Sequence, residues 1–289
     1  MLECVVNVSE GRDAGTLAAL AQACGPCLLD LHSDAYHHRS VLTLVGDDEP
    51  VESAVRDLAR LTVALLDLRE HAGAHPRFGV LDVVPWVALE GWPVRDAARG
   101  PTTNDRATSD RARRARDHFA LWAGAELRVP VFLYGPERSL PQVRRDAWRT
   151  LVPDAGPSAP HPTAGAVAAG CRPLMVAYNL WLRGGDLARA KAIAAAIRSA
   201  EIRALGFALG DRLQVSCNLV APLTVGPAAV RDQVGRLAEV ERAELVGLVP
   251  ESVLRAVPEQ RWAELDLAPE QTIEYRLSHA GDNSDWCGR

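Results

Sequence analysis

The feature that most constrains the fold is one order of apolar segments that occurs twice in the chain. In the first half, short apolar segments lie at 3–8, 27–31, 40–45 and 80–87, and the first of them is rich in β-branched residues. A helical pattern at 14–24 follows the first apolar segment, and a second helical pattern precedes the last apolar segment. That second pattern has apolar residues in steps of three and four: Val51, Val55, Leu58, Leu61, Leu65 and Leu68. The order strand–helix–strand–strand–helix–strand is that of the ferredoxin-like, or split βαβ, unit.

The same order returns in the second half. Predicted strands lie at 174–180, 204–209, 213–220 and 243–248, with helices at about 187–197 and 228–240. Asp186 precedes the first of these helices and can cap it. The two halves share no obvious sequence identity, so the repeat is one of topology only. The prediction is an α+β protein with two ferredoxin-like (βαββαβ) α/β-sandwich subdomains.

A long insertion separates the two repeats. It is expected to hold a helix at 106–126, a strand at 131–134, a helix at 141–151 and a loop rich in Gly, Pro and Ser at 153–165. We therefore expect an N-terminal subdomain over 1–173 and a C-terminal subdomain over 174–277. The polar tail, 278–289, is expected to be ordered only if it docks on another surface.

Composition and charge exclude several classes of protein. The chain is 48% hydrophobic and 24% charged, as is typical of a globular protein, and its net charge of -5 argues against a nucleic-acid partner. The densest basic run, Arg111 to Arg116, has acidic neighbours and is interpreted as a solvated helix face. No stretch is long and apolar enough to cross a membrane. The start lacks the pattern of a secretory signal and the six cysteines form no evident framework, so a cytoplasmic protein is expected.

One pair of cysteines has the spacing of a redox motif. Cys24-Gly25-Pro26-Cys27 matches the thioredoxin tetrapeptide, in which the first cysteine begins a helix and has a lowered pKa. Here the helical pattern precedes the motif and an apolar segment follows it. The sequence therefore favours a helix stop and turn over a redox site.

The segment His71 to Arg77 carries the first candidate chemistry. Pro76 biases His75 away from the helical conformation, and Gly73 also interrupts a helix, so two metal ligands at helical spacing are not expected. A loop histidine bound only to backbone is one alternative. The other is an acid/base, because a loop histidine is expected to titrate near neutral pH and Arg77 could bind an anion nearby.

Two further loops could contribute to a site. Asp34 to Arg39 precedes a predicted strand, and a solvated polar loop is the alternative interpretation. Gly156 to Gly165 is rich in Gly and Pro, so it either links two elements or lines the pocket of a flat ligand. It lacks the pattern of a Walker phosphate loop.

Several segments together resemble one known family. Residues 3–12 (Glu-Cys-Val-Val-Asn-Val-Ser-Glu-Gly-Arg) resemble the opening Glu-Cys-Val-Pro-Asn-Phe-Ser-Glu-Gly of glutamate formimidoyltransferases. Residues 71–83 are similar to that family's His-Lys-Gly-Glu-His-Pro-Arg-x-Gly-x-x-Asp-Val, whose catalytic histidine falls on His75. Further blocks in the same order extend the resemblance over about residues 3–276: Pro130–Gly135, Gly156–Gly165, Ala177–Leu180, Gln214–Leu219 and Val246–Pro250.

The resemblance implies the formiminotransferase fold, a homodimer and a one-carbon transfer in histidine degradation. A formimino group would move from N-formimino-L-glutamate to the co-substrate tetrahydrofolate, giving 5-formiminotetrahydrofolate. The chain would lack the cyclodeaminase domain of the mammalian relatives, so a separate protein would deaminate the product. No metal is expected. The family's folate-binding stretch falls on Gly156, Pro157, Ser158, His161, Pro162, Thr163 and Gly165.

The implied chemistry assigns roles to few side chains. His75 would take the proton from the folate nitrogen and return one to the leaving nitrogen. Arg39 and Arg77 are candidates to bind the donor's carboxylates in bidentate fashion, and Asp34 lies in the same loop as Arg39.

The chain also departs from the family's pattern. Tyr36 replaces an acid of bacterial relatives, His38 replaces an amide, and Ala74 replaces the glutamate before the catalytic histidine. Two alternatives to the transferase therefore stay open. One is the same amidine chemistry with a different donor or acceptor, and the other is a non-catalytic folate-binding relative.

Overall fold

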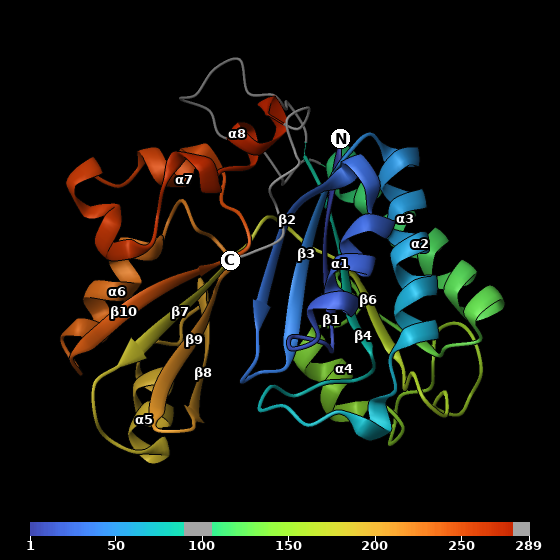
Figure 1. The fold of residues 1–289 in the computed structure, drawn as a ribbon, viewed down its shortest axis with the longest axis horizontal. Coiled ribbons are helices and arrows are strands. Elements are labelled where there is room, and N and C mark those ends of the chain that lie inside the picture. Colours follow the sequence, from blue (N-terminus) through green and yellow to red (C-terminus); the bar gives the residue numbers. More distant parts are fainter. Residues whose placement is uncertain (90–105, 280–289) are drawn as a thin grey trace. The chain divides into compact units, whose positions relative to one another are not determined.

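The structure, a computed structural model, describes residues 1–89 and 106–279 (Figure 1). Contacts divide these residues into two units, the first made of 1–89 and 106–173 and the second of 174–279. Each unit has its own sheet and its own hydrophobic core. None of the helices within the described residues is long and apolar enough to cross a membrane.

The first unit is built on a six-stranded sheet of order β2-β3-β1-β4-β6-β5. The first four strands of this order are antiparallel and have the ferredoxin-like arrangement, whereas β6 pairs in parallel with both β4 and β5. Strand β6 was not predicted, because its Val-Ala-Ala-Gly-Cys sequence has weak strand propensity. The strands are β1 (Leu2–Val8), β2 (Leu28–Asp34), β3 (Arg39–Gly46), β4 (Leu81–Ala88), β5 (Val131–Tyr134) and β6 (Val167–Cys171).

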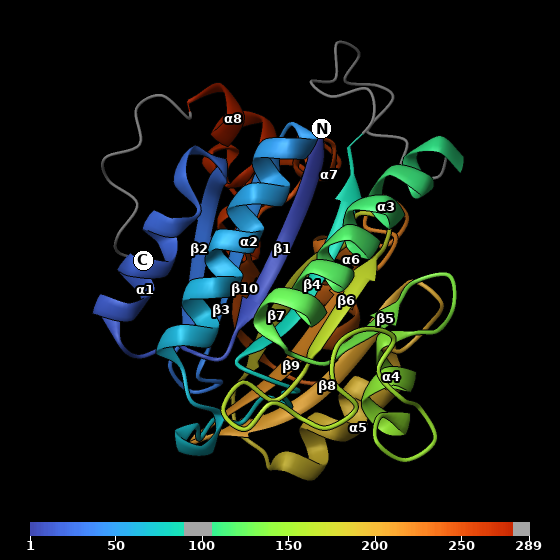
Figure 2. The same ribbon diagram turned by 90° about the vertical axis from the view of Figure 1, so that its right-hand side faces the viewer.

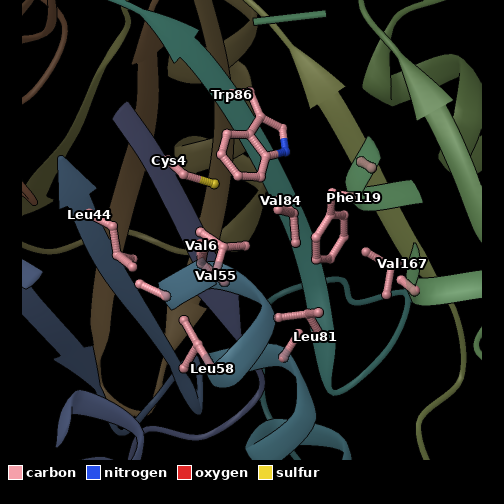
Figure 3. Packing of buried hydrophobic residues seen from close by; sticks show 14 of the residues in the cluster. Cys4, Val6, Leu44, Val55, Leu58, Leu81, Val84, Trp86, Phe119 and Val167 are labelled. Atoms are coloured by element: carbon pink, nitrogen blue, oxygen red, sulfur yellow. The ribbon is translucent and has the colours of Figure 1, made fainter. Parts of the chain in front are cut away.

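Three helices cover one face of this sheet (Figure 2). They are α1 (Ala14–Ala23), α2 (Asp48–Leu65) and α3 (Arg106–Trp122), and a π-helical turn, Ala123–Leu127, extends α3. Asp13 begins α1, because its carboxylate accepts a hydrogen bond from the backbone N–H of Thr16 (2.6 Å). The core between the helices and the sheet includes Trp86 and Phe119, which are fully buried (Figure 3).

One prediction about α3 is wrong. Arg116 belongs to the basic run interpreted as a solvated face, but its side chain is only 1% exposed. It donates to the backbone carbonyl of Tyr134 (3.0 Å) and to both carboxylate oxygens of Glu137 (2.7 and 2.8 Å). Arg116 therefore joins α3 to the segment that follows β5, and the other arginines of the run lie nearer the surface.

A short helix, α4 (Leu140–Asp146), packs on β5 and β6 with a separate cluster of apolar residues. Ser139 and Gln142 form a reciprocal capping box at its start. The predicted helix extended to residue 151, but the observed one ends earlier. Ala147 leaves the helical conformation and Trp148 adopts a left-handed one (φ 65°).

The second unit repeats the ferredoxin-like order with four antiparallel strands, β10-β7-β9-β8. The strands are β7 (Val176–Leu182), β8 (Ile202–Leu209), β9 (Arg212–Leu219) and β10 (Val240–Val246). The helices α5 (Leu187–Ile197) and α6 (Pro227–Gly235) contribute to its core, and Asp186 caps α5 as predicted. The predicted α+β class with two sheets is thus confirmed.

The end of the second unit holds two helices that the sequence did not predict, α7 (Glu251–Arg255) and α8 (Ile273–Ser278). Both are too short to give a clear periodic pattern. Ser278, the first residue of the predicted polar tail, ends α8. Residues 280–289 of that tail lie outside the described residues.

The Cys24–Cys27 segment forms a turn between α1 and β2. Residues Gly25–Cys27 make a single 3₁₀ turn, and both thiols are buried. Burial, with a smaller effect of the neighbouring Cys27, raises the pKa of Cys24 to about 12. Burial also raises the pKa of Cys27. Protonated buried thiols are poor nucleophiles, so this geometry favours the turn interpretation over the redox one.

We expect the double substitution Cys24→Ser/Cys27→Ser to leave activity unchanged under reducing conditions. The native thiols should also resist alkylation, because they are buried and protonated. The measurement is site-resolved labelling with iodoacetamide, with the unfolded protein as the positive control. Rapid labelling of the native pair, or a large loss of activity in a folded double variant, would restore the redox interpretation.

Candidate active site

Four segments noted in the sequence meet at one end of the six-stranded sheet. They are the end of β1 with Ser9 and Glu10, the β2–β3 turn, the stretch from α2 to β4, and the stretch before β6. In Figure 1 the β2–β3 turn and the α2–β4 stretch lie at the same end of the sheet. Backbone hydrogen bonds join the segments in pairs: Ser9 N–H to Val80 (2.7 Å), Ala74 N–H to Tyr36 (3.2 Å) and Leu68 N–H to Thr163 (2.7 Å).

The His75 loop packs directly against the β2–β3 turn at Gly73. A Cβ atom on Gly73 would lie 2.2 Å from the backbone oxygen of His37 and 2.9 Å from the Cβ of His38. Only glycine permits such an approach, because a backbone carbonyl cannot move aside as a flexible side chain can. Gly73 therefore sets the distance between the two segments that carry His37 and His75.

We expect Gly73→Ala to destabilise the protein by about 1–3 kcal/mol, because the methyl group overpacks the turn. The activity should fall as well, because the loop that carries His75 is displaced. Chemical denaturation and initial rates measure the two effects. The matched control is Gly15→Ala in α1, where the new Cβ would lie 3.6 Å from a carboxylate oxygen of Asp13 and should be tolerated. If the two variants have equal stability and equal initial rates, the result would contradict the close packing at Gly73.

His75 is held by its own loop in a defined tautomer. Its Nδ1 lies 2.6 Å from the backbone oxygen of Pro76. Because a carbonyl can only accept, we assign the proton to Nδ1 and the lone pair to Nε2. The ring of His37 stands edge-on to that of His75, with 5.7 Å between the ring centroids.

The pKa of His75 corrects the expectation of a histidine that titrates near neutrality. Burial, together with the positive charge of Arg39, lowers the pKa of His75 from 6.5 to about 3. The ring is partly exposed by surface area, but protein atoms surround it densely, and this burial is the largest cause of the lowered pKa. The imidazole is therefore neutral at physiological pH. A neutral imidazole can begin a reaction as a base and not as an acid.

Asp82 is the electrostatic centre of the site. Its side chain is fully buried and accepts from Arg39 Nη1 (2.5 Å), Arg144 Nη2 (2.7 Å) and the backbone N–H of Phe78 (2.6 Å). Burial alone would raise the pKa of Asp82, but Arg39 and Arg144 outweigh it, and the pKa lies below its usual value. Arg39 also donates to the side-chain oxygen of Asn7 (2.9 and 3.2 Å). One carboxylate thus holds two guanidinium groups beside His75.

The residues predicted to bind the donor take part in building the site. Arg77 donates to the backbone oxygens of His71, Gly73 and His75 and so holds the loop together. Asp34 accepts from the backbone N–H of His37 (2.7 Å) and fixes the β2–β3 turn. The donor-binding roles of Asp34, Arg39 and Arg77 stay predictions.

A second pair of histidines closes the turn. The rings of His38 and His71 stack with 4.3 Å between centroids, and His71 Nε2 donates to the backbone oxygen of His38 (2.7 Å). His38 adopts a left-handed conformation (φ 49°), which asparagine also adopts readily. Burial lowers the pKa of both rings, so the pair is neutral near pH 7.

The two ends of the predicted folate segment lie in different surroundings. The end from His161 to Gly165 forms a turn in which those two residues exchange backbone hydrogen bonds (2.8 and 3.0 Å). It borders the His75 loop, because Val80 N–H donates to Ala164 (3.0 Å). At the other end, Gly156 (φ 81°) packs against Val129 and Gly124. The folate-binding roles of Gly156, Pro157, Ser158, His161, Pro162, Thr163 and Gly165 stay predictions.

Asp82, Arg144 and Asn7 were not predicted as site residues. A charged residue within the apolar segment 80–87 could have indicated that Asp82 has a buried partner. Arg144 carries no comparable signal, because it lies on a separate helix 62 residues from its partner. In the described part of the chain, no group of three or more His, Cys, Asp or Glu side chains is arranged to hold a metal ion.

Comparisons with known proteins agree with this geometry. A family model described as the formiminotransferase domain, N-terminal subdomain, matches residues 1–172. The chain is 34% identical to a glutamate formimidoyltransferase of Streptococcus pyogenes serotype M1 over 246 residues, which cover 76% of this chain and 77% of that protein. It is 31% identical to a glutamate formimidoyltransferase of Thermoplasma acidophilum, with 88% and 89% covered.

A third relative is bifunctional. The chain is 32% identical to the formimidoyltransferase-cyclodeaminase of Sus scrofa over 287 residues, which cover 86% of this chain but 50% of that protein. The fold, the site and the relatives together define a group transferase. The chain belongs to the formiminotransferase family.

Proposed function

We propose that this protein transfers a formimino group from N-formimino-L-glutamate to tetrahydrofolate, giving 5-formiminotetrahydrofolate and glutamate. The observation that carries the proposal is the neutral His75, held as the Nδ1–H tautomer where four segments shared with the family meet. The names of the S. pyogenes and T. acidophilum relatives support the choice of donor. We further propose a cytoplasmic homodimer that needs no metal, with residues 174–277 as its C-terminal subdomain.

The chemistry follows from the protonation state of His75. N5 of tetrahydrofolate attacks the amidine carbon of the donor, and a new C–N bond gives a tetrahedral intermediate. N5 becomes acidic once it has bonded to carbon, so the weakly basic Nε2 of His75 can accept its proton. The resulting imidazolium is a strong acid in this site. It returns the proton to the glutamate nitrogen as the old C–N bond breaks, and neutral His75 is regenerated.

We expect the activity to show no acid limb near pH 6.5, the usual pKa of histidine. A base must be unprotonated, and a pKa lowered to about 3 moves its protonation far below neutrality. The profile of kcat/KM should therefore be nearly flat between about pH 5 and 8 as far as His75 is concerned. Initial rates across this range test the point, with circular dichroism at each pH to confirm folding. If the folded protein loses half of its activity near pH 6.5, the result would contradict a buried, neutral His75.

The test of the function is turnover by the purified protein with formiminoglutamate and tetrahydrofolate, with glutamate and the folate product measured by mass spectrometry. Reactions that lack either substrate are the controls. Formation of both products in equal amounts supports the proposal. Binding of tetrahydrofolate without turnover of any amidine would instead identify a non-catalytic folate-binding relative.

One observation favours a second candidate, the same amidine transfer with a different donor. Tyr36, where relatives have an acid, is 49% exposed, and its backbone oxygen binds the N–H of Ala74, where the family has glutamate. Two carboxylates are thus replaced beside His75. A panel of N-formimino amino acids without a side-chain carboxylate separates the candidates. Faster turnover of an uncharged donor than of formiminoglutamate would favour the second one.

A further inference from the structure

One arginine reaches the site from outside the ferredoxin-like repeat. Arg144 lies on α4, in the insertion, and both of its terminal nitrogens make contacts near His75. Nη2 donates to Asp82 Oδ2 at 2.7 Å, and Nη1 donates to the backbone oxygen of Pro76 at 3.2 Å. The side chain is 22% exposed, so most of it is enclosed by the site. Its two donors bridge a buried carboxylate and a loop carbonyl.

The Pro76 carbonyl is the group that orients the catalytic ring. It accepts from His75 Nδ1 at 2.6 Å and from Arg144 Nη1 at 3.2 Å, so two donors share one oxygen. The proline ring fixes φ of this residue, which leaves ψ to set the direction of the carbonyl. Arg144 holds that carbonyl from one side. Two residues further on, the Phe78 N–H is held by Asp82 (2.6 Å), which Arg144 also binds.

The charges around His75 come from four elements. Arg39 of β3 and Arg144 of α4 are positive, and Asp82 of β4 is negative. Arg77 belongs to the same loop as His75, and His37 faces the ring from the β2–β3 turn. Arg39 and Arg144 are cations that disfavour the imidazolium, whereas Asp82 favours it. Arg144 thus both donates to the Pro76 carbonyl and adds to the lowered pKa of His75, of which burial is the largest cause.

From these contacts we infer that Arg144 is a positioning residue for His75: it holds the Pro76 carbonyl that fixes the Nδ1–H tautomer, with Asp82 as its anchor. The inference rests on the proposed role of His75 as the base, and it adds a residue that acts only through that base. A guanidinium suits this role because its planar fork can serve two acceptors at once, whereas an ammonium group is a single point charge.

The first experiment compares Arg144→Met with the matched control Arg145→Met in the full-length chain. Arg145 is the next residue of the same helix, is 62% exposed and, within the described residues, its side chain pairs only with Asp146. We expect Arg144→Met to lower kcat by about 10- to 100-fold, as misplacement of a catalytic group does, with both KM values changed less than about twofold. Arg145→Met should match the wild type. A raised KM with unchanged kcat would overturn the inference, because it would place Arg144 on a substrate.

A double variant tests whether Arg144 acts through His75. In a His75→Ala background, Arg144→Met should cause no further loss of rate, because the group that it positions is already absent. A further loss of about tenfold would show that Arg144 contributes independently, and would overturn the inference. Thermal unfolding of each variant reports the folding separately from the rate.

The closing measurement needs no turnover. Nitrogen-15 spectra of histidine-labelled protein report which ring nitrogen carries the proton. We expect the wild type to show His75 as the Nδ1–H tautomer and Arg144→Met to show a mixture of tautomers. An unchanged tautomer in folded Arg144→Met would overturn the inference even if formiminoglutamate is turned over. A shifted tautomer would sustain it even if the proposed donor is wrong.

Arg144→Lys keeps the inference testable if the methionine variant does not fold. Lysine can pair with Asp82 and restore stability, but one ammonium group cannot also hold the Pro76 carbonyl in the same geometry. We therefore expect the Arg144→Lys variant to fold, with a mixed His75 tautomer and a kcat that stays low. Full recovery of both the tautomer and kcat would show that charge alone is needed, and would overturn the bridging role.

Discussion

His75→Ala should lower kcat by about two to four orders of magnitude while the protein stays folded and binds folate nearly as before. The ring is the only group at the meeting of the four segments that we assign as a base, and its Nδ1 proton is already bound to Pro76. Alanine removes the base and leaves the loop, because Arg77 holds that loop through its backbone oxygens.

Two measurements check this expectation. Single-turnover rates report the chemical step, and equilibrium binding of tetrahydrofolate reports the rest of the site. His32→Ala is a useful comparison, since it removes a histidine from β2 instead of from the catalytic loop. Turnover by His75→Ala within a few-fold of the wild type would remove His75 from the mechanism.

Asp82→Asn should be the most destabilising single change in the site, at about 3–5 kcal/mol, the cost of removing one partner from a buried ion pair. The side chain is fully buried and neutralises part of the charge of Arg39 and Arg144. Asparagine keeps the size but leaves both guanidinium groups without a counter-charge. Urea denaturation measures the loss through the midpoint of the transition.

The control for Asp82 is Asp57→Asn in α2. Asp57 pairs with Arg60 at 2.6 Å, but both side chains are about half exposed (52% and 53%). We expect its effect to stay within about 0.5 kcal/mol, since surface ion pairs contribute little. If Asp82→Asn costs no more than Asp57→Asn, the charges at the site are better solvated than their burial indicates.

The sequence predicted the two repeats because their apolar periodicity is local. The steps of three and four from Val51 to Leu65 fall on α2, and the predicted strand at 131–134 is β5 as observed. β6 was missed because Ala and Gly dominate it, and its burial comes from the two strands beside it. The early end of α4 depends on the left-handed Trp148, which no local pattern indicates.

The candidate site was predictable only in part. The resemblance indicated His75 from a single motif, and the neighbouring Gly73 and Pro76 were visible beside it. The electrostatic environment of His75 could not be predicted from the sequence. Burial lowers the pKa of His75 most, and Arg39 and Arg144, which approach from β3 and α4, lower it further, whereas Asp82 raises it. Interactions between residues far apart in sequence have no local signature, so both Arg144 and the neutral state of the ring required the structure.

The burial of His75 also makes the stability of the fold depend on pH. In the unfolded chain this imidazole titrates near pH 6.5, but in the native protein its pKa is about 3. Between these values the unfolded state binds a proton that the native state excludes, so each fall in pH across the window lowers the free energy of unfolding. Above pH 6.5, the pKa in the unfolded chain, His75 is neutral in both states and no longer lowers the free energy of unfolding. The same packing that prepares a base for catalysis therefore lowers the stability of the first unit as the pH falls from about 6.5 towards 3.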